Sequence, residues 1–171
     1  MRQPETDELC RRCGKESETI QHITAACEQL EPTEYVKRHD GLTKIIHQKL
    51  AEAAELIEDK SPYYKCTPAN VLESENFKLY WSRSIFKDKT IPFNRPDKQN
   101  KYQEMANEIC SMWKQKAAQA VPIVISSTGV IPKSLSQSLT RLNLHPNTHT
   151  QLQKSVIRGT FSTVRNFLNY K

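Results

Sequence analysis

The chain has 171 residues, of which 37% are apolar and 26% are charged, with only 4 glycines. This composition excludes a disordered chain and is typical of a helix-rich protein, with room for one ordinary domain and a small metal-stabilised module. No stretch approaches the roughly eighteen apolar residues of a membrane-spanning helix, and the first residues lack the apolar core of a secretion signal. We therefore expect an intracellular protein without a membrane partner.

Charge is distributed unevenly along the chain. Residues 1–108 carry 17 Lys and Arg against 19 Asp and Glu, whereas residues 109–171 carry 8 Lys and Arg and no acidic residue. A long segment without carboxylates creates a positive field that attracts polyanions, so we expect DNA or RNA as the partner and a nuclear location. Because the cations are dispersed, a merely solubilising surface is the alternative interpretation.

Residues 1–31 are predicted to form a zinc knuckle. Its ligands are Cys10, Cys13, His22 and Cys27. Three thiolates and one imidazole complete the tetrahedral shell of Zn²⁺, which would then be structural, with no open catalytic position. Gly14 can supply the positive φ angle of a tight turn, and a helical turn starting near Thr19 and ending before Cys27 would carry the last two ligands. Ordinary buried thiols beside an unrelated histidine are the alternative.

The knuckle region is acidic overall, which weakens any expectation that it grips phosphate by itself. Only Arg11 and Arg12, which lie between two ligands, are well placed to contact a nucleic-acid backbone.

Residues 32–60 are predicted to be an amphipathic helical segment with Thr33 as its N-cap. Apolar residues recur there at steps of three and four, namely Leu42, Ile45, Ile46, Leu50, Ala53 and Ile57. Gly41 is a point at which this helix can break. His39 and His47 lie outside the knuckle spacing and are expected on a polar face.

Residues 61–171 form the third predicted region. A proline-containing connector over 59–75 leads into it. Alternating apolar residues predict a strand over 76–83, and a helical pattern predicts a helix over 100–120. The short apolar run at 123–125 predicts a strand that needs cover on both faces, as in an α/β sheet.

Two helices are predicted to end the chain. Ser134 caps the first, which ends at His145 and Pro146, and the second starts at Asn147 or Thr148. The buried side of the second is expected to consist of Leu152, Val156, Val164, Phe167 and Leu168. Its basic ridge consists of Lys154, Arg158 and Arg165. These cations are spaced by four and seven residues, so they share one face, where we expect phosphate to bind.

A further short motif, Pro96-Asp97 followed by Lys101 and Tyr102, has the residue types of a restriction-type nuclease site. Such sites hold Mg²⁺ with paired carboxylates, and a lysine positions the attacking water. A lone Pro-Asp is a weak signal, because any loop can contain one.

The order of motifs resembles the C-terminal region of insect non-LTR retrotransposon polyproteins, of the type that carries a restriction-like endonuclease and inserts into ribosomal RNA genes. The matching stretches are residues 10–27, 35–40 (Tyr-Val-Lys-Arg-His-Asp), 95–97 (Arg-Pro-Asp), 101–106 (Lys-Tyr-Gln-Glu-Met-Ala) and 122–132 (Pro-Ile-Val-Ile-Ser-Ser-Thr-Gly-Val-Ile-Pro). The resemblance implies that a CCHC zinc knuckle precedes the nuclease and binds RNA and DNA. It also implies that Asp97 is the first nuclease carboxylate and that Lys101 with Tyr102 is the later basic and aromatic pair.

The chain departs from that family in ways that argue against enzymatic activity. It contains no Tyr-x-Asp-Asp polymerase motif, and three residues stand between Asp97 and Lys101, where the family places a strand bearing a second aspartate. Glu104 and Glu108 are the only later carboxylates, and neither occupies that strand position. We therefore expect an α+β, mainly helical protein: a knuckle followed by a truncated, catalytically inactive endonuclease remnant.

Three functional hypotheses follow from the sequence. The first is a zinc-binding, nucleic-acid-binding fragment without a small-molecule substrate. The second is a residual Mg²⁺-dependent DNA-nicking activity at Asp97, Glu104, Lys101 and Tyr102. The third is an adaptor whose knuckle and helix over 42–57 bind a protein partner.

Overall fold

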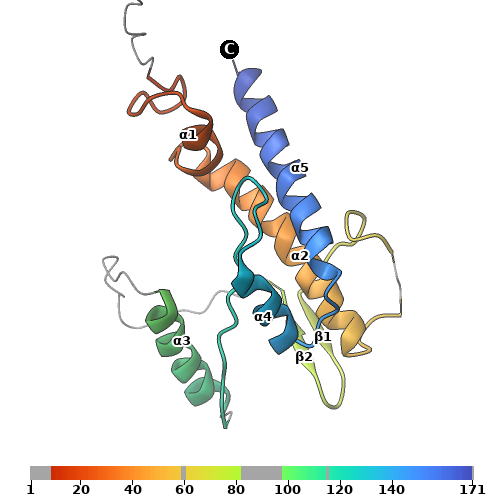
Figure 1. Cartoon of the computed structure of the whole chain (residues 1–171). Helices are drawn as coiled ribbons and strands as arrows, with labels where there is room; N and C mark the ends of the chain where they lie inside the picture. Colours follow the sequence, from red (N-terminus) through yellow and green to blue (C-terminus); the bar gives the residue numbers. More distant parts are fainter. Residues whose placement is uncertain (1–8, 59–60, 82–97, 115, 171) are drawn as a thin grey trace, which may run out of the picture. The chain divides into compact units, whose positions relative to one another are not determined.

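The computed structural model describes residues 9–58, 61–81, 98–114 and 116–170, with side chains in the third range from Ala106 onward. The described helices are α1 (Ile20–Ala25), the π-helix η1 (Glu31–Tyr35), α2 (Val36–Ala53), α3 (Lys98–Trp113), α4 (Lys133–Arg141) and α5 (Thr148–Leu168). Strands β1 (Val71–Glu73) and β2 (Lys78–Tyr80) form a two-stranded antiparallel sheet. The fold is therefore α+β and mainly helical, as predicted (Figure 1).

The chain divides into two units, residues 1–81 with 124–171 and residues 82–123. The prediction of three segments, 1–31, 32–60 and 61–171, stays a prediction. Among the described helices, none is long and apolar enough to cross a lipid bilayer.

The first unit is built on the antiparallel packing of α2 and α5, which lie side by side in Figure 1. Asn166 Nδ2 donates to Glu34 Oε2 at 3.2 Å near one end, and Arg38 Nη1 donates to Thr160 Oγ1 at 3.2 Å further along. The residue numbers of the partners thus rise along one helix and fall along the other, as in an antiparallel pair. The knuckle and η1 lie at the C-terminal end of α5, and α4 packs against the same helix.

Glycines allow the two helices to approach closely. A Cβ atom at Gly41 would lie 3.1 Å from Ser155 Oγ, and one at Gly159 would lie 2.8 Å from Arg38 Cγ. Helix α2 runs through Gly41 without interruption, so the break that was considered there does not occur. The residue serves close helix packing instead of helix termination.

The start and the buried face of α2 differ from the prediction. The π-helix η1 begins at Glu31 and leads directly into α2, so Thr33 is not an N-cap. Ile45, Gln48 and Ala51 are buried, while Ala53 is exposed. His39 is exposed as expected, but His47 is 6% exposed, with its ring edge-on to Trp81 at 5.5 Å between centroids. The predicted apolar stripe was thus rotated slightly from the true buried face, because polar His47 and Gln48 belong to it.

The hairpin of β1 and β2 packs beside α2. Strand β2 lies within the predicted strand at 76–83, and β1 lies in the segment that was predicted to be an irregular connector. Val71 pairs with Tyr80, Leu72 with Leu79 and Glu73 with Lys78. Three-residue strands are too short for a period-two pattern to identify both partners.

The C-terminal half contains one clear correction. Residues 123–125 form no strand, and Val124 is 56% exposed, because no other strand of the described chain lies beside them. Helices α4 and α5 start near the predicted positions, but neither Ser134 nor any other side chain caps α4. Leu152, Val156 and Phe167 are buried as expected and Val164 is half-buried, whereas Leu168 is 61% exposed.

In the second unit, α3 accounts for most of the described residues. It ends at Trp113, before the predicted limit at residue 120. Lys114 follows with a φ angle of 51°, and a left-handed residue at this position typically ends a helix.

Candidate metal centre and basic face

Four ligand atoms converge in the N-terminal module. The Sγ atoms of Cys10, Cys13 and Cys27 and a ring nitrogen of His22 all lie within 4.8 Å of one another. The Cys10 and Cys27 sulfurs are 3.9 Å apart, and Cys13 Sγ is 3.3 Å from His22 Nε2. A tetrahedron with metal–sulfur bonds of about 2.3 Å has sulfur–sulfur edges of about 3.8 Å. The predicted ligand set therefore fits the size and donor chemistry of a tetrahedral zinc ion.

A tight turn presents the first two ligands. The backbone N–H of Gly14 donates to the Cys10 carbonyl at 2.7 Å, and Gly14 adopts the predicted positive φ, 66°. The Cys10 N–H donates to the Glu16 carbonyl at 2.7 Å, and Leu9 pairs with Ser17 in an antiparallel bridge. These bonds fold the segment back on itself, so that both sulfurs face the same point.

Helix α1 presents the other two ligands, as the spacing predicted. Thr19 caps it by accepting a hydrogen bond from the His22 N–H at 3.1 Å, and Cys27 follows the last turn. Tyr35 fixes this turn from η1: its hydroxyl accepts the Cys27 N–H at 3.0 Å and donates to the Ile23 carbonyl at 2.9 Å.

A carboxylate orients the imidazole. Glu16 Oε2 lies 3.0 Å from His22 Nδ1, on the side of the ring opposite to Cys13. A proton on Nδ1 that is donated to this carboxylate leaves the Nε2 lone pair directed at the cysteine sulfurs. Such carboxylate–histidine pairs hold the ring of metal-binding histidines in place.

Two cysteines of the cluster have shifted thiol pKa values. The backbone N–H of Lys15, which donates to the sulfur, lowers the pKa of Cys13 to about 7. Burial raises the pKa of Cys27 to about 11. A buried thiol of this kind gives up its proton when a cation takes the proton's place, so metal binding would release protons.

An apolar core joins the knuckle to the last turn of α5. Phe167 is 1% exposed and packs with Cys10, Ile23, Cys27 and Leu30. The buried cysteines of the cluster thus pack with a phenyl ring that lies 140 residues beyond Cys27 in the sequence.

Arg38 adds a polar tie between the same parts. Its guanidinium donates to the Thr24 carbonyl of α1 at 2.8 Å, in addition to Thr160 of α5. The knuckle is therefore held on the α2 and α5 pair by both apolar and polar contacts.

Comparison with known proteins gives no match, whether with a family model, a curated protein or a solved structure. The function is therefore argued from the chain's own residues.

The two arginines of the knuckle are engaged within the chain. Arg11 Nε lies 3.0 Å from a carboxylate oxygen of Glu18, and its guanidinium carbon lies 5.2 Å from the centre of the Phe167 ring. The guanidinium carbon of Arg12 lies 3.9 Å from the centre of the Tyr170 ring. Their predicted role at a nucleic-acid backbone stays a prediction. A phosphate would have to compete with these contacts within the chain.

The basic ridge predicted on α5 has no such partners among the described residues. We call it the basic row, and its members are Lys154, Arg158 and Arg165. All three are exposed and form no ion pair within the described part of the chain. Helix α5 contains no acidic residue. By contrast, Lys37, Lys49 and Lys78 are each paired with a glutamate at 2.6–3.0 Å.

The predicted nuclease residues lie in or before α3. Asp97 lies outside the described residues, and Lys101 and Tyr102 belong to α3, where only their backbone is described.

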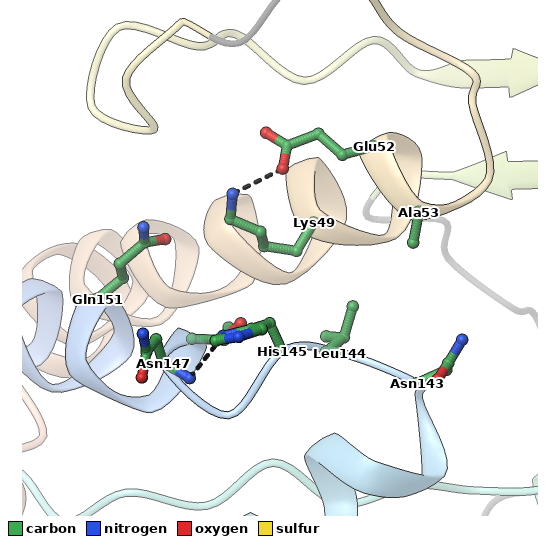
Figure 2. Close-up of a pocket in the computed structure, with 9 residues that line it drawn as sticks. Lys49, Glu52, Ala53, Asn143, Leu144, His145, Asn147 and Gln151 are labelled. Atoms are coloured by element: carbon green, nitrogen blue, oxygen red, sulfur yellow. Dashed lines mark hydrogen bonds and ion pairs between the residues drawn. The ribbon is translucent and has the colours of Figure 1, made fainter.

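A pocket of about 440 Å³ lies elsewhere, between the C-terminal turns of α2 and the connection from α4 to α5 (Figure 2). Lys49 and Glu52 are ion-paired at its rim, and the Asn147 N–H donates to His145 Nδ1 at 3.1 Å. None of the predicted site residues lines it.

Sequence reasoning missed the groups that support the cluster. Glu16, Tyr35 and Phe167 contact the ligands or their turns, but only contacts across the fold reveal this. The carboxylates inside the knuckle loop were the available signal, but the loop contains both Glu16 and Glu18, and only the fold shows that Glu16 contacts the imidazole.

Proposed function

We propose that this protein is a zinc-stapled nucleic-acid-binding module without catalytic activity. The observation that carries the proposal is the arrangement on α5. One face of the helix packs Phe167 against the Cys3His cluster, and another presents the basic row.

The metal has a structural role in this proposal. Cys10, Cys13, His22 and Cys27 would hold Zn²⁺, Glu16 would orient the imidazole, and the closed ligand shell would leave no position for substrate. Zn²⁺ held by these residues would cross-link the turn at Gly14 to helix α1. Because Cys10 and Cys27 share a core with Phe167, this cross-link would also fix the end of α5.

The nucleic-acid partner is supported by charge. Three exposed cations without acidic partners in the described chain lie on a helix that lacks carboxylates, and they can neutralise backbone phosphates. The order of motifs supports an origin as the C-terminal fragment of a retrotransposon polyprotein, with residues 61–171 as a truncated nuclease. The irregular backbone at 123–125 weakens the nuclease part of that origin.

The decisive experiment is a titration of short labelled DNA and RNA at increasing KCl. If the three cations each contact one phosphate, the logarithm of affinity falls with that of salt with a slope of about −2 to −3. The affinity then drops about 20- to 40-fold between about 50 and 200 mM salt. The triple variant Lys154→Gln, Arg158→Gln, Arg165→Gln should lose this dependence.

A matched control separates the effect of the basic row from the effect of overall net charge. The triple variant Lys37→Gln, Lys49→Gln, Lys78→Gln removes the same net charge from lysines that are already ion-paired. It should bind like the wild type. Equal losses in both triple variants, or an affinity that ignores salt, would contradict the proposal.

A further inference from the structure

The exposed side of α5 carries an apolar row next to the basic row. Its members are Ile157, Phe161 and Leu168, which are 48%, 69% and 61% exposed. At 3.6 residues per turn, their mean direction is rotated by about 60° from that of the basic row. Two parallel rows, one apolar and one cationic, therefore run along the same helix.

Phe161 is central to this surface. It follows Arg158 by three residues and precedes Arg165 by four, so both guanidinium groups are its neighbours on the helix surface. Single exposed apolar side chains are ordinary, but a phenyl ring more than two-thirds exposed between two arginines has the features on which proteins stack nucleic-acid bases.

A polar turn borders the apolar row on its other side. Gln153 Nε2 donates to the Gly129 carbonyl at 2.9 Å, and Thr160 Oγ1 donates to the Ser127 carbonyl. A Cβ atom at Gly129 would lie 2.7 Å from Ile157 Cγ1, so the turn is seated directly on the helix. The hydroxyls of Ser126 and Thr128, which are exposed, lie at this edge, 2.9 Å apart.

Resting on the proposed function, we infer that this face binds single-stranded nucleic acid, with an unpaired base stacked on Phe161 and the adjacent phosphates on the basic row. A duplex satisfies the basic row alone, because its bases are stacked inside and offer no face to the ring. A membrane surface fits this face less well. Helices that lie in a membrane interface have a broad apolar face with cations along its borders. Here the apolar row is narrow, with cations along one edge and the turn at residues 126–129 along the other. Charge complementarity therefore favours a nucleic acid, and the exposed Phe161 ring favours a single strand.

The test compares three probes of equal length in fluorescence anisotropy titrations: oligothymidylate, an abasic strand and a blunt duplex. The wild type should bind oligothymidylate more tightly than the other two. Phe161→Leu should weaken oligothymidylate binding by about 5- to 150-fold, the range for one base–aromatic stack, and leave abasic-strand binding and the salt slope unchanged.

Phe77→Leu is the control, because Phe77 is also an exposed phenylalanine, 56% exposed, outside this surface. Equal affinities of the two variants for oligothymidylate, or duplex binding as tight as single-strand binding, would overturn the inference and leave the proposed function standing. Absence of salt-dependent binding to all three probes would overturn both. The inference would also be overturned if Phe161→Leu changed only the binding of the protein to anionic lipid vesicles.

Discussion

Two phenylalanines on α5 provide a direct test of how the knuckle is held. Phe167 is 1% exposed within the core around the cysteine cluster, whereas Phe161, six residues earlier on the same helix, is 69% exposed. Replacing a buried phenylalanine with alanine removes its transfer energy and leaves a cavity, which typically costs about 3–5 kcal/mol. The same substitution at an exposed position changes the free energy of unfolding by no more than about 0.5 kcal/mol. The change in helix propensity is the same at both sites.

The measurement is thermal unfolding of Phe167→Ala and Phe161→Ala with one equivalent of zinc, followed by circular dichroism. For a chain of this size, 1 kcal/mol corresponds to about 2–4 °C, so Phe167→Ala should lower Tm by about 6–20 °C. Phe161→Ala should remain within about 2 °C of the wild type. If both variants lose the same amount, the knuckle does not depend on α5 and the packing argument is wrong.

Two further predictions concern the helix pair. Gly159→Ala should lower Tm despite the better helix propensity of alanine, because its Cβ atom would meet Arg38 Cγ at 2.8 Å. Gly41→Ala should lower Tm less, because its Cβ atom would meet only the Ser155 hydroxyl, at 3.1 Å. The opposite order would contradict the close packing. Burial lowers the pKa of His47 from its ordinary 6.5, so the unfolded chain binds protons more readily and stability falls as the pH drops through 6.5. Urea midpoints at about pH 7.5 and 5.5 should therefore differ less for His47→Leu than for the wild type, and equal differences would exclude this role.

The sequence predicted the parts of this molecule that depend on local chemistry. The ligand spacing, the positive φ of Gly14 and the helical turn after Thr19 follow from residues close together in the chain. Helix α5 was also predictable, because its buried positions at 152, 156 and 167 repeat with helical periodicity over about four turns.

Contacts between distant segments were not predictable. Gly41 was considered as a possible helix break, but its close approach to Ser155 on α5 decides its role. Leu168 was expected to be buried by its periodicity, yet the knuckle covers only Phe167 beside it. The run at 123–125 is apolar enough for a strand, but a strand needs neighbours, and a sequence pattern alone does not supply them.

Metal content tests the central claim most directly. Elemental analysis combined with native mass spectrometry of purified protein should give one zinc per chain, and cobalt substitution should give the visible spectrum of a tetrahedral thiolate site. Cys27→Ser should lose both signals, while Cys66→Ser, which alters a cysteine outside the cluster, should retain them. Protein that contains no zinc and binds cobalt no better than Cys27→Ser would contradict the metal centre and the function built on it.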